Sequence, residues 1–148
     1  MKKERGFSII EIVLVLGVIG ILSSFIVPKT RDYLAMAKDS KVINTLNSIR
    51  MASESYYLEN GEYAFDGENK TLADALPNLS KYMRDNLKVE SDKILLEIGG
   101  SKSGKETEES VVYGGKVEVY IDSNKEIVLK PIDGVGDFNM RGEEWSKM

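Results

Sequence analysis

An apolar run close to the N-terminus dominates this sequence. Phe7 to Val27 comprises 21 residues, and Glu11 is the only ionisable side chain among them. In a helix with a rise of about 1.5 Å per residue, this run extends about 31 Å, which matches the roughly 30 Å hydrocarbon core of a bilayer. The sequence therefore predicts a transmembrane helix, which we assign to residues 7–28.

The charges in front of the run predict its orientation. Lys2, Lys3 and Arg5 outnumber Glu4 there, and the cytoplasmic flanks of membrane helices are rich in Lys and Arg. A secretory signal peptide has the same polarity, but its apolar region is usually about 7–15 residues long and is followed by a small-residue cleavage site. We therefore expect a single-pass protein of the cytoplasmic (inner) membrane, with the N-terminus inside and residues 29–148 outside.

Two absences from the composition restrict the chemistry. The 148 residues include no cysteine and no histidine, which excludes disulfides, thiolate nucleophiles, and the commonest general base and zinc ligand. The sequence also contains no phosphate-binding glycine loop and no Gly-x-Ser-x-Gly motif. We expect one ordinary domain outside the membrane that is not an enzyme.

A motif lies where the apolar run begins. A short basic leader precedes the sequence Gly6-Phe7-Ser8-Ile9-Ile10-Glu11. This pattern resembles the N-terminal processing motif of type IV pilins and of the pseudopilins of type II secretion systems, with Ile9 where that family commonly has Leu. The resemblance implies a leader peptide of residues 1–6, cleavage between Gly6 and Phe7 by a membrane-embedded prepilin peptidase, and methylation of the new Phe7 amine.

Glu11 needs a partner if it enters an apolar environment. A charged carboxylate in a membrane helix costs roughly 2.5–3.5 kcal/mol on insertion scales, although a position near the interface can reach water. Cleavage would leave a cationic amine at Phe7, four residues earlier in the chain. In a bundle of identical helices, the amine of a neighbouring copy would satisfy the buried carboxylate. We therefore predict that Glu11 sets the axial register of assembly.

Pro28 lies at the end of the apolar run. A proline removes one backbone donor and clashes with the preceding turn, so it either kinks a helix or ends it. The resemblance implies the first outcome, a helix kinked at Pro28 that continues into the following segment.

Residues 29–60 have the pattern of an amphipathic helix. Asn60-Gly61 is expected to end it, because glycine readily takes the left-handed conformation found at helix C-termini. The apolar side is predicted at Val42, Leu46, Ile49, Ser53 and Tyr56, and the polar side at Lys38, Asp39, Lys41, Asn44, Asn47, Arg50 and Glu54. The end of this helix, with Tyr56-Tyr57 and Asn60-Gly61-Glu62-Tyr63, also resembles pilins, with Ala64 where they commonly have proline.

The rest of the chain changes to the pattern of strands. Residues 61–92 are predicted as a loop and a short helix that has Thr71 as N-cap and is interrupted near Pro77. Residues 93–131 are predicted as an antiparallel sheet, with a hairpin connection at 122–125 and a polar loop at 99–110. Residues 132–148 form a C-terminal tail. The predicted fold class is α+β, a long N-terminal helix packed against a small antiparallel sheet, as in pilins.

The tail contains the only candidate metal ligands. Asp133 and Asp137 flank a glycine-containing turn, and carboxylates of this kind can bind calcium. Major pseudopilins of type II secretion carry calcium in this general region, but their ligand motif does not map onto this tail residue by residue. Solvated acidic turns are common, so the alternative is a protein without any cofactor.

The resemblance implies a structural fibre subunit, in a type IV pilus used for adhesion, motility or DNA uptake or in a type II secretion pseudopilus. The implied partners are copies of the chain and related minor subunits, the prepilin peptidase, an inner-membrane assembly platform, and lipid before assembly. The alternative is a membrane-anchored extracytoplasmic binding domain that forms no fibre. Loss of the leader removes Lys2, Lys3, Arg5 and Glu4 and changes the formal charge from -4 to -6, so we expect no direct nucleic-acid binding.

Overall fold

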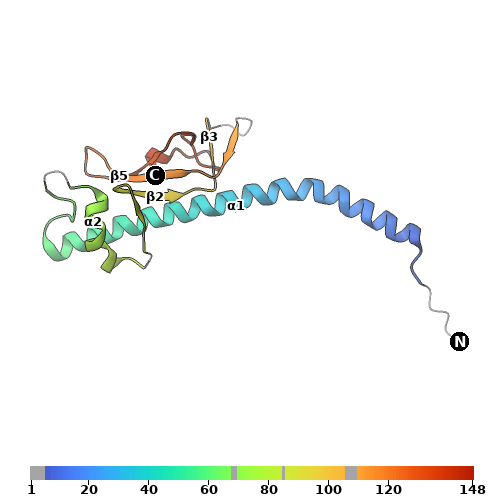
Figure 1. The fold of residues 1–148 in the computed structure, drawn as a ribbon, viewed down its shortest axis with the longest axis horizontal. Helices are drawn as coiled ribbons and strands as arrows, with labels where there is room; N and C mark the ends of the chain where they lie inside the picture. The colour runs from blue at the N-terminus through green and yellow to red at the C-terminus, as the bar shows by residue number, and fades with distance from the viewer. Residues whose placement is uncertain (1–5, 68–69, 85, 106–109) are drawn as a thin grey trace. The chain divides into compact units, whose positions relative to one another are not determined.

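The computed structural model describes residues 6–67, 70–84, 86–105 and 110–148. The chain divides into two compact units, residues 1–33 and residues 34–148. Helix α1 (Ile9–Asn60) contributes to both, and all strands belong to the second (Figure 1). Most of the predicted leader, residues 1–5, lies outside the described residues.

Helix α1 contains both predicted helical segments. It begins at Ile9 and has no break at Pro28. At its C-terminus the Gly61 N–H donates to the Tyr57 carbonyl oxygen over 2.8 Å, and Gly61 has a φ of 77°. A left-handed glycine with this hydrogen bond is a common way to end an α-helix. The predicted end at Asn60-Gly61 is therefore confirmed.

The main sheet has four antiparallel strands in the order β1-β2-β5-β6. Their bounds are Val89–Glu90 for β1, Lys93–Glu97 for β2, Lys116–Ile121 for β5 and Ile127–Pro131 for β6. The register pairs Val119 with Ile94 on one side and with Leu129 on the other. In β5, Val117 and Val119 are buried and Glu118 between them is only partly so. This alternation is the period-two pattern of a sheet with one face on the core.

The sheet begins earlier than predicted. β1 falls inside the segment 61–92, which we had assigned to a loop and a short helix, and it forms a tight hairpin with β2. The two connecting residues, Ser91 and Asp92, have φ values of 52° and 60°. Positive φ at both central residues is typical of the hairpin turn that matches strand twist. The usual Asn-Gly signal for that turn is absent, so the hairpin was missed.

A second correction concerns the predicted loop at 99–110. Its first residues form β3 (Gly100–Lys102), which pairs antiparallel with β4 (Val111–Tyr113) in a separate two-stranded sheet. Gly-Ser-Lys has little intrinsic preference for strands, and strand formation depends strongly on packing. Here all three residues are buried, so tertiary contacts form this strand.

The core of the second unit lies between α1 and the main sheet. The predicted apolar face of α1 is buried at Val42, Leu46 and Ile49, together with Ala52. Figure 1 shows strands β2 and β5 alongside this part of the helix. The two elements share one hydrophobic cluster with α2 (Leu72–Leu79), and the sheet contributes Ile94, Val117, Val119, Ile127 and Leu129. The predicted fold class, a long helix packed on a small antiparallel sheet, is confirmed.

The short helix α2 has the predicted N-cap. The Asp74 N–H donates to Thr71 Oγ1 over 3.3 Å, and the Thr71 N–H donates to Asp74 Oδ2 over 2.9 Å, which forms a capping box. Pro77 does not interrupt the helix, which continues to Leu79 before a 3₁₀ turn, η1 (Ser80–Tyr82).

Removal of this cap should weaken the second unit modestly. Thr71→Ala leaves the helix without a side-chain acceptor, which usually costs about 1 kcal/mol. The free energy of unfolding in detergent, measured by urea titration, should fall by that amount. Thr71→Ser, which keeps the hydroxyl, should stay close to the wild type. Equal losses for both variants would contradict the capping role.

The C-terminal tail is part of the core. Trp145, in the 3₁₀ turn η2 (Trp145–Lys147), is fully buried and belongs to the same hydrophobic cluster as the helix face. The backbone N–H of Trp145 donates to the Asp137 carbonyl oxygen over 3.0 Å. Phe138 forms isolated antiparallel β-bridges with both Lys102 and Glu144. The tail therefore closes back onto β3 and onto the end of the sheet.

Asp39 is buried, although the sequence pattern predicts that it lies on the polar face of α1. It is 1% exposed and accepts three backbone N–H groups, from Gly99 at 2.8 Å, Gly100 at 3.4 Å and Met140 at 3.0 Å. Gly99 also approaches α1 so closely that an added Cβ would lie 2.0 Å from the Ala35 carbonyl oxygen. One carboxylate thus joins the helix, β3 and the tail.

The pKa of Asp39 predicts a pH effect on stability. Burial raises this pKa above its usual 3.8, and the amide donors and the charge of Arg141 oppose the rise. Because the folded chain then binds the proton more tightly than the unfolded chain, this contribution to stability is complete below about pH 4 and is lost as pH rises through the folded pKa. Asp39→Asn cannot titrate, so its unfolding free energy should lack this decline. An identical pH profile for both proteins would contradict the raised pKa.

Candidate functional site

The predicted cleavage site lies immediately before α1. Gly6 and Phe7 have no regular secondary structure, and Phe7 is 86% exposed. A Cβ built on Gly6 would meet no atom within 4 Å. Nothing in the described part of this chain therefore requires glycine at position 6. The bond between Gly6 and Phe7 lies in an exposed, non-helical segment that a peptidase could bind in an extended form.

Ser8 and Glu11 cap the start of α1 with their side chains. The Ser8 N–H donates to Glu11 Oε2 over 2.8 Å, and the Ile10 N–H donates to Ser8 Oγ over 3.3 Å. The carboxylate thus satisfies one donor at the positive end of the helix dipole. This role is not among the sequence-based predictions, although Ser-x-x-Glu before an apolar run is a known signal for it. Glu11 therefore has an intramolecular partner in a single copy.

Among the described residues, the apolar side chains in the first part of α1 are exposed. Every large apolar residue from Ile9 to Val27 is at least 48% exposed. Within the described residues, α1 is the one helix that is long and apolar enough to cross a membrane. Such exposure in water would be a strong aggregation hazard. In lipid, or in contact with the same segment of other copies, the side chains are covered.

Helix α1 continues through Pro28. The proline has no N–H to donate, so one hydrogen bond of the helix is missing there. Two nearby hydroxyls bond back to carbonyl oxygens, Ser24 to Ile21 over 2.6 Å and Thr30 to Ile26 over 3.0 Å, as such side chains commonly do in helices. The predicted continuation past the proline is confirmed, and the kink stays a prediction.

The two predicted calcium ligands do not form a cluster in the described residues. Asp133 and Asp137 are exposed, and no group of three acidic side chains that could hold a metal ion occurs in those parts of the chain. Gly136, between them, donates its N–H to Ser101 Oγ over 2.9 Å. Calcium binding at this turn stays a prediction.

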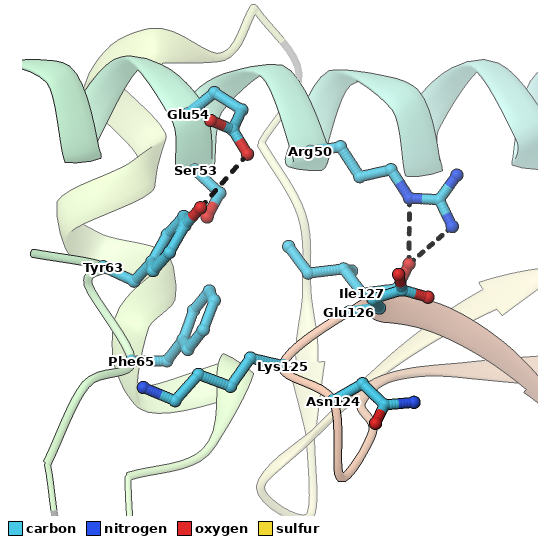
Figure 2. A pocket seen from close by; sticks show the side chains of 9 residues that line it. All are labelled: Arg50, Ser53, Glu54, Tyr63, Phe65, Asn124, Lys125, Glu126 and Ile127. Atoms are coloured by element: carbon cyan, nitrogen blue, oxygen red, sulfur yellow. Dashed lines mark hydrogen bonds between the residues drawn. The ribbon is translucent and has the colours of Figure 1, made fainter.

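A cavity of about 590 Å³ lies between α1 and the β5–β6 hairpin. Figure 2 shows the Arg50 guanidinium bonded to the Ile127 carbonyl oxygen, at 2.9 and 2.7 Å, and the Tyr63 hydroxyl directed at Glu54, at 3.4 Å. Lys125, at the rim, pairs with Asp66 over 2.6 Å. These side chains hold loops together, and in the described residues the Ser53 hydroxyl of the lining has no hydrogen bond to a base. The cavity gives no reason to assign an enzymatic reaction.

The comparison with known proteins bears on the resemblance at the N-terminus. The model described as "Prokaryotic N-terminal methylation motif" matches residues 1–27. Those residues include Gly6, Phe7 and Glu11. The chain is related to the type IV pilins and type II secretion pseudopilins. The predicted resemblance is confirmed, and this pilin-type N-terminus is followed by the expected fold.

Relatives of both kinds match. The "Type IV major pilin protein PilE" of Neisseria gonorrhoeae is 29% identical over 103 residues, which are 70% of this chain and 61% of the relative. A "Fimbrial protein" of Pseudomonas aeruginosa is 34% identical over 62 residues, 42% of this chain and 40% of the relative. The "Type II secretion system core protein G" of Klebsiella pneumoniae is 27% identical over 85 residues, 57% of this chain and 61% of the relative.

The extent of these matches is limited. The chain spans less than two thirds of the length of these relatives, and no solved structure matches it significantly. The names of the relatives describe pilins, fimbriae and secretion components rather than enzymes.

Proposed function

We propose that this chain is a structural fibre subunit that is processed by a prepilin peptidase and assembled from the membrane into a type IV pilus or a type II secretion pseudopilus. The observation that carries the proposal is the apolar first part of α1, which begins directly after the motif at Gly6 and Phe7 and is exposed in the part of the chain that the structure describes. Relatives of both fibre types support the class of function.

The membrane and the fibre would cover the same surface in succession. The apolar side chains of α1 are solvated by lipid before assembly, with the N-terminus in the cytoplasm. They later pack against identical helices, where van der Waals contact replaces lipid. In the fibre, the main partners are copies of the chain and related minor subunits. Before assembly, the partners are the prepilin peptidase and an assembly platform in the inner membrane.

Glu11 would exchange partners in this process. In a single copy its carboxylate accepts the Ser8 N–H. Cleavage before Phe7 creates a new amine, and the amine of a neighbouring copy offers a full positive charge in place of a neutral donor. The bond to Ser8 already has an ionised acceptor, and a charged donor adds Coulomb attraction, which is strong where water is excluded. The exchange therefore favours one axial position of each helix against the next.

The test is whether the chain is found in fibres. Filaments sheared from the native host should react along their length with an antibody against residues 34–148, or short filaments should appear when the chain is overproduced together with its secretion machinery. Recovery of the chain only as single copies in membranes, under both conditions, would contradict the proposal and favour a membrane-anchored binding domain.

A further inference from the structure

The C-terminal end of α1 carries an acidic surface with an apolar centre. Met51 and Leu58 are 64% and 83% exposed. They are seven residues apart and so lie within about 20° of each other around the helix, with Glu54 and Glu59 on opposite sides of them. Glu62 follows just beyond the end of the helix and is exposed. We name these five residues the acidic strip.

A groove of opposite charge lies beside an earlier part of α1. Its volume is about 410 Å³, and apolar walls and two cations line it: Lys38, Lys41, Val42, Leu87, Leu95 and Leu96. We name these residues the basic groove. Glu97, an acidic residue, also lines it. Within the part of the chain that the structure describes, neither Lys38 nor Lys41 forms an ion pair.

One copy cannot bring these two surfaces together. Lys41 and Leu58 are 17 residues apart on the same helix, which corresponds to about 26 Å along the axis and about 100° around it. Two copies can do so if they are displaced along the helix direction by about that distance and are also rotated about that direction relative to each other. The strip of the first then faces the groove of the second, whose own strip stays free for a third. Contacts of this heterologous kind generate open filaments rather than closed pairs.

The chemistry favours a second copy as the occupant. The chain has a net charge of -4, and the basic groove, with Lys38 and Lys41 in its lining, is a complement to the acidic strip within the same molecule. Leu58, an exposed leucine between carboxylates, matches an apolar groove with lysines at its rim. Complementary potentials of this kind select the partner and fix its register.

We propose that the acidic strip of one copy docks in the basic groove of another and so forms a longitudinal contact of the fibre. The proposal rests on the proposed fibre function and adds the contact outside the membrane helices. The contact fixes a displacement of about 26 Å along the axis between the two copies that share it. This constraint adds to the axial register that Glu11 would set near the N-terminus.

A charge exchange tests the contact. In the native host, Lys38→Glu with Lys41→Glu should lower the yield of sheared fibres at least about ten-fold, and so should Glu59→Lys with Glu62→Lys, because each pair places like charges together. All four substitutions in one chain should restore the yield to within about three-fold of the wild type. The matched control is Tyr82→Phe, which removes the hydrogen bond that Tyr82 donates to Glu59 without changing a charge, and it should leave the yield unchanged.

The outcomes separate the contact from the fibre itself. The docking contact would be overturned if the four-substitution variant gave as few fibres as the two double variants, or if the double variants gave as many fibres as the wild type. The proposed function would still stand in both cases, because the wild type forms fibres. A wild type that forms no fibre under any condition would overturn both.

Disulfide trapping keeps the test decisive if a charged variant does not accumulate. The chain has no cysteine, and Lys41→Cys with Leu58→Cys places the thiols too far apart to join within one copy. Oxidised fibres should give a ladder of dimers, trimers and longer species. Asn47→Cys with Leu58→Cys, whose first position faces away from the groove, should not. Fibres of the first variant without a ladder would overturn the contact.

Discussion

Glu11→Ala should reduce fibre yield at least about ten-fold without lowering the amount of chain in the membrane. The carboxylate is the only charge in the apolar run, and in a packed bundle it would be the partner of the Phe7 amine of a neighbour. Its loss leaves that amine buried without a counter-charge, which is costly in a water-free environment. Fibre yield after shearing, relative to membrane-bound chain, measures the effect.

Glu11→Gln separates the two roles of this side chain. Glutamine keeps an oxygen that can accept the Ser8 N–H, as Glu11 Oε2 does over 2.8 Å, but it carries no charge. If charge pairing between copies governs assembly, the Gln variant should be nearly as defective as the Ala variant. Full recovery with glutamine would show that Glu11 acts only by capping its own helix, and it would remove the register role.

Asp39→Ala should destabilise the second unit by about 3 kcal/mol, because it leaves three buried amide donors without an acceptor. The donors are the N–H groups of Gly99, Gly100 and Met140. They belong to β3 and the tail, so the loss should loosen the contact of both with α1. The fluorescence of Trp145, the single tryptophan and fully buried, reports unfolding in detergent directly.

Lys38→Ala is the matched control for Asp39→Ala. Lys38 is the preceding residue on the same helix and is exposed, so its truncation should change the unfolding free energy by less than about 0.5 kcal/mol. Asp39→Ala with a comparably small effect would mean that water or a shifted backbone replaces the carboxylate, and it would contradict the joining role of Asp39.

Local patterns predicted the parts of this chain that depend on neighbouring residues. The long apolar helix follows from the length of the apolar run, and the buried face at Val42, Leu46 and Ile49 follows from helical spacing. The N-cap at Thr71 follows from the residue types at the start of α2. The processing motif near Gly6 could be found because its residues are adjacent in the sequence.

Features that depend on distant residues could not be predicted in this way. Asp39 is buried because Gly99 and Met140, 60 and 101 residues away, supply donors to its carboxylate. The strand at Gly100–Lys102 exists because of its pairing with β4 and its burial. Trp145 completes the core from the last residues of the chain. In each case the contact, rather than the local propensity, determines the structure.

Calcium binding has a direct test of its own. If Asp133 and Asp137 hold the ion, calcium should raise the thermal midpoint of the wild type, since a ligand that binds only the folded state stabilises it. Asp133→Asn with Asp137→Asn should abolish that shift. If millimolar calcium does not shift the thermal midpoint of the wild type, calcium binding at this turn is contradicted.

The mass of the mature chain tests the central claim most directly. The chain should be extracted from membranes of its native host, where the prepilin peptidase is present, and examined by intact mass and N-terminal sequencing. Processing predicts a chain that begins at N-methylated Phe7 and lacks residues 1–6. A chain that still begins at Met1, in membranes and in any filaments, would contradict the account and leave a signal-anchored domain.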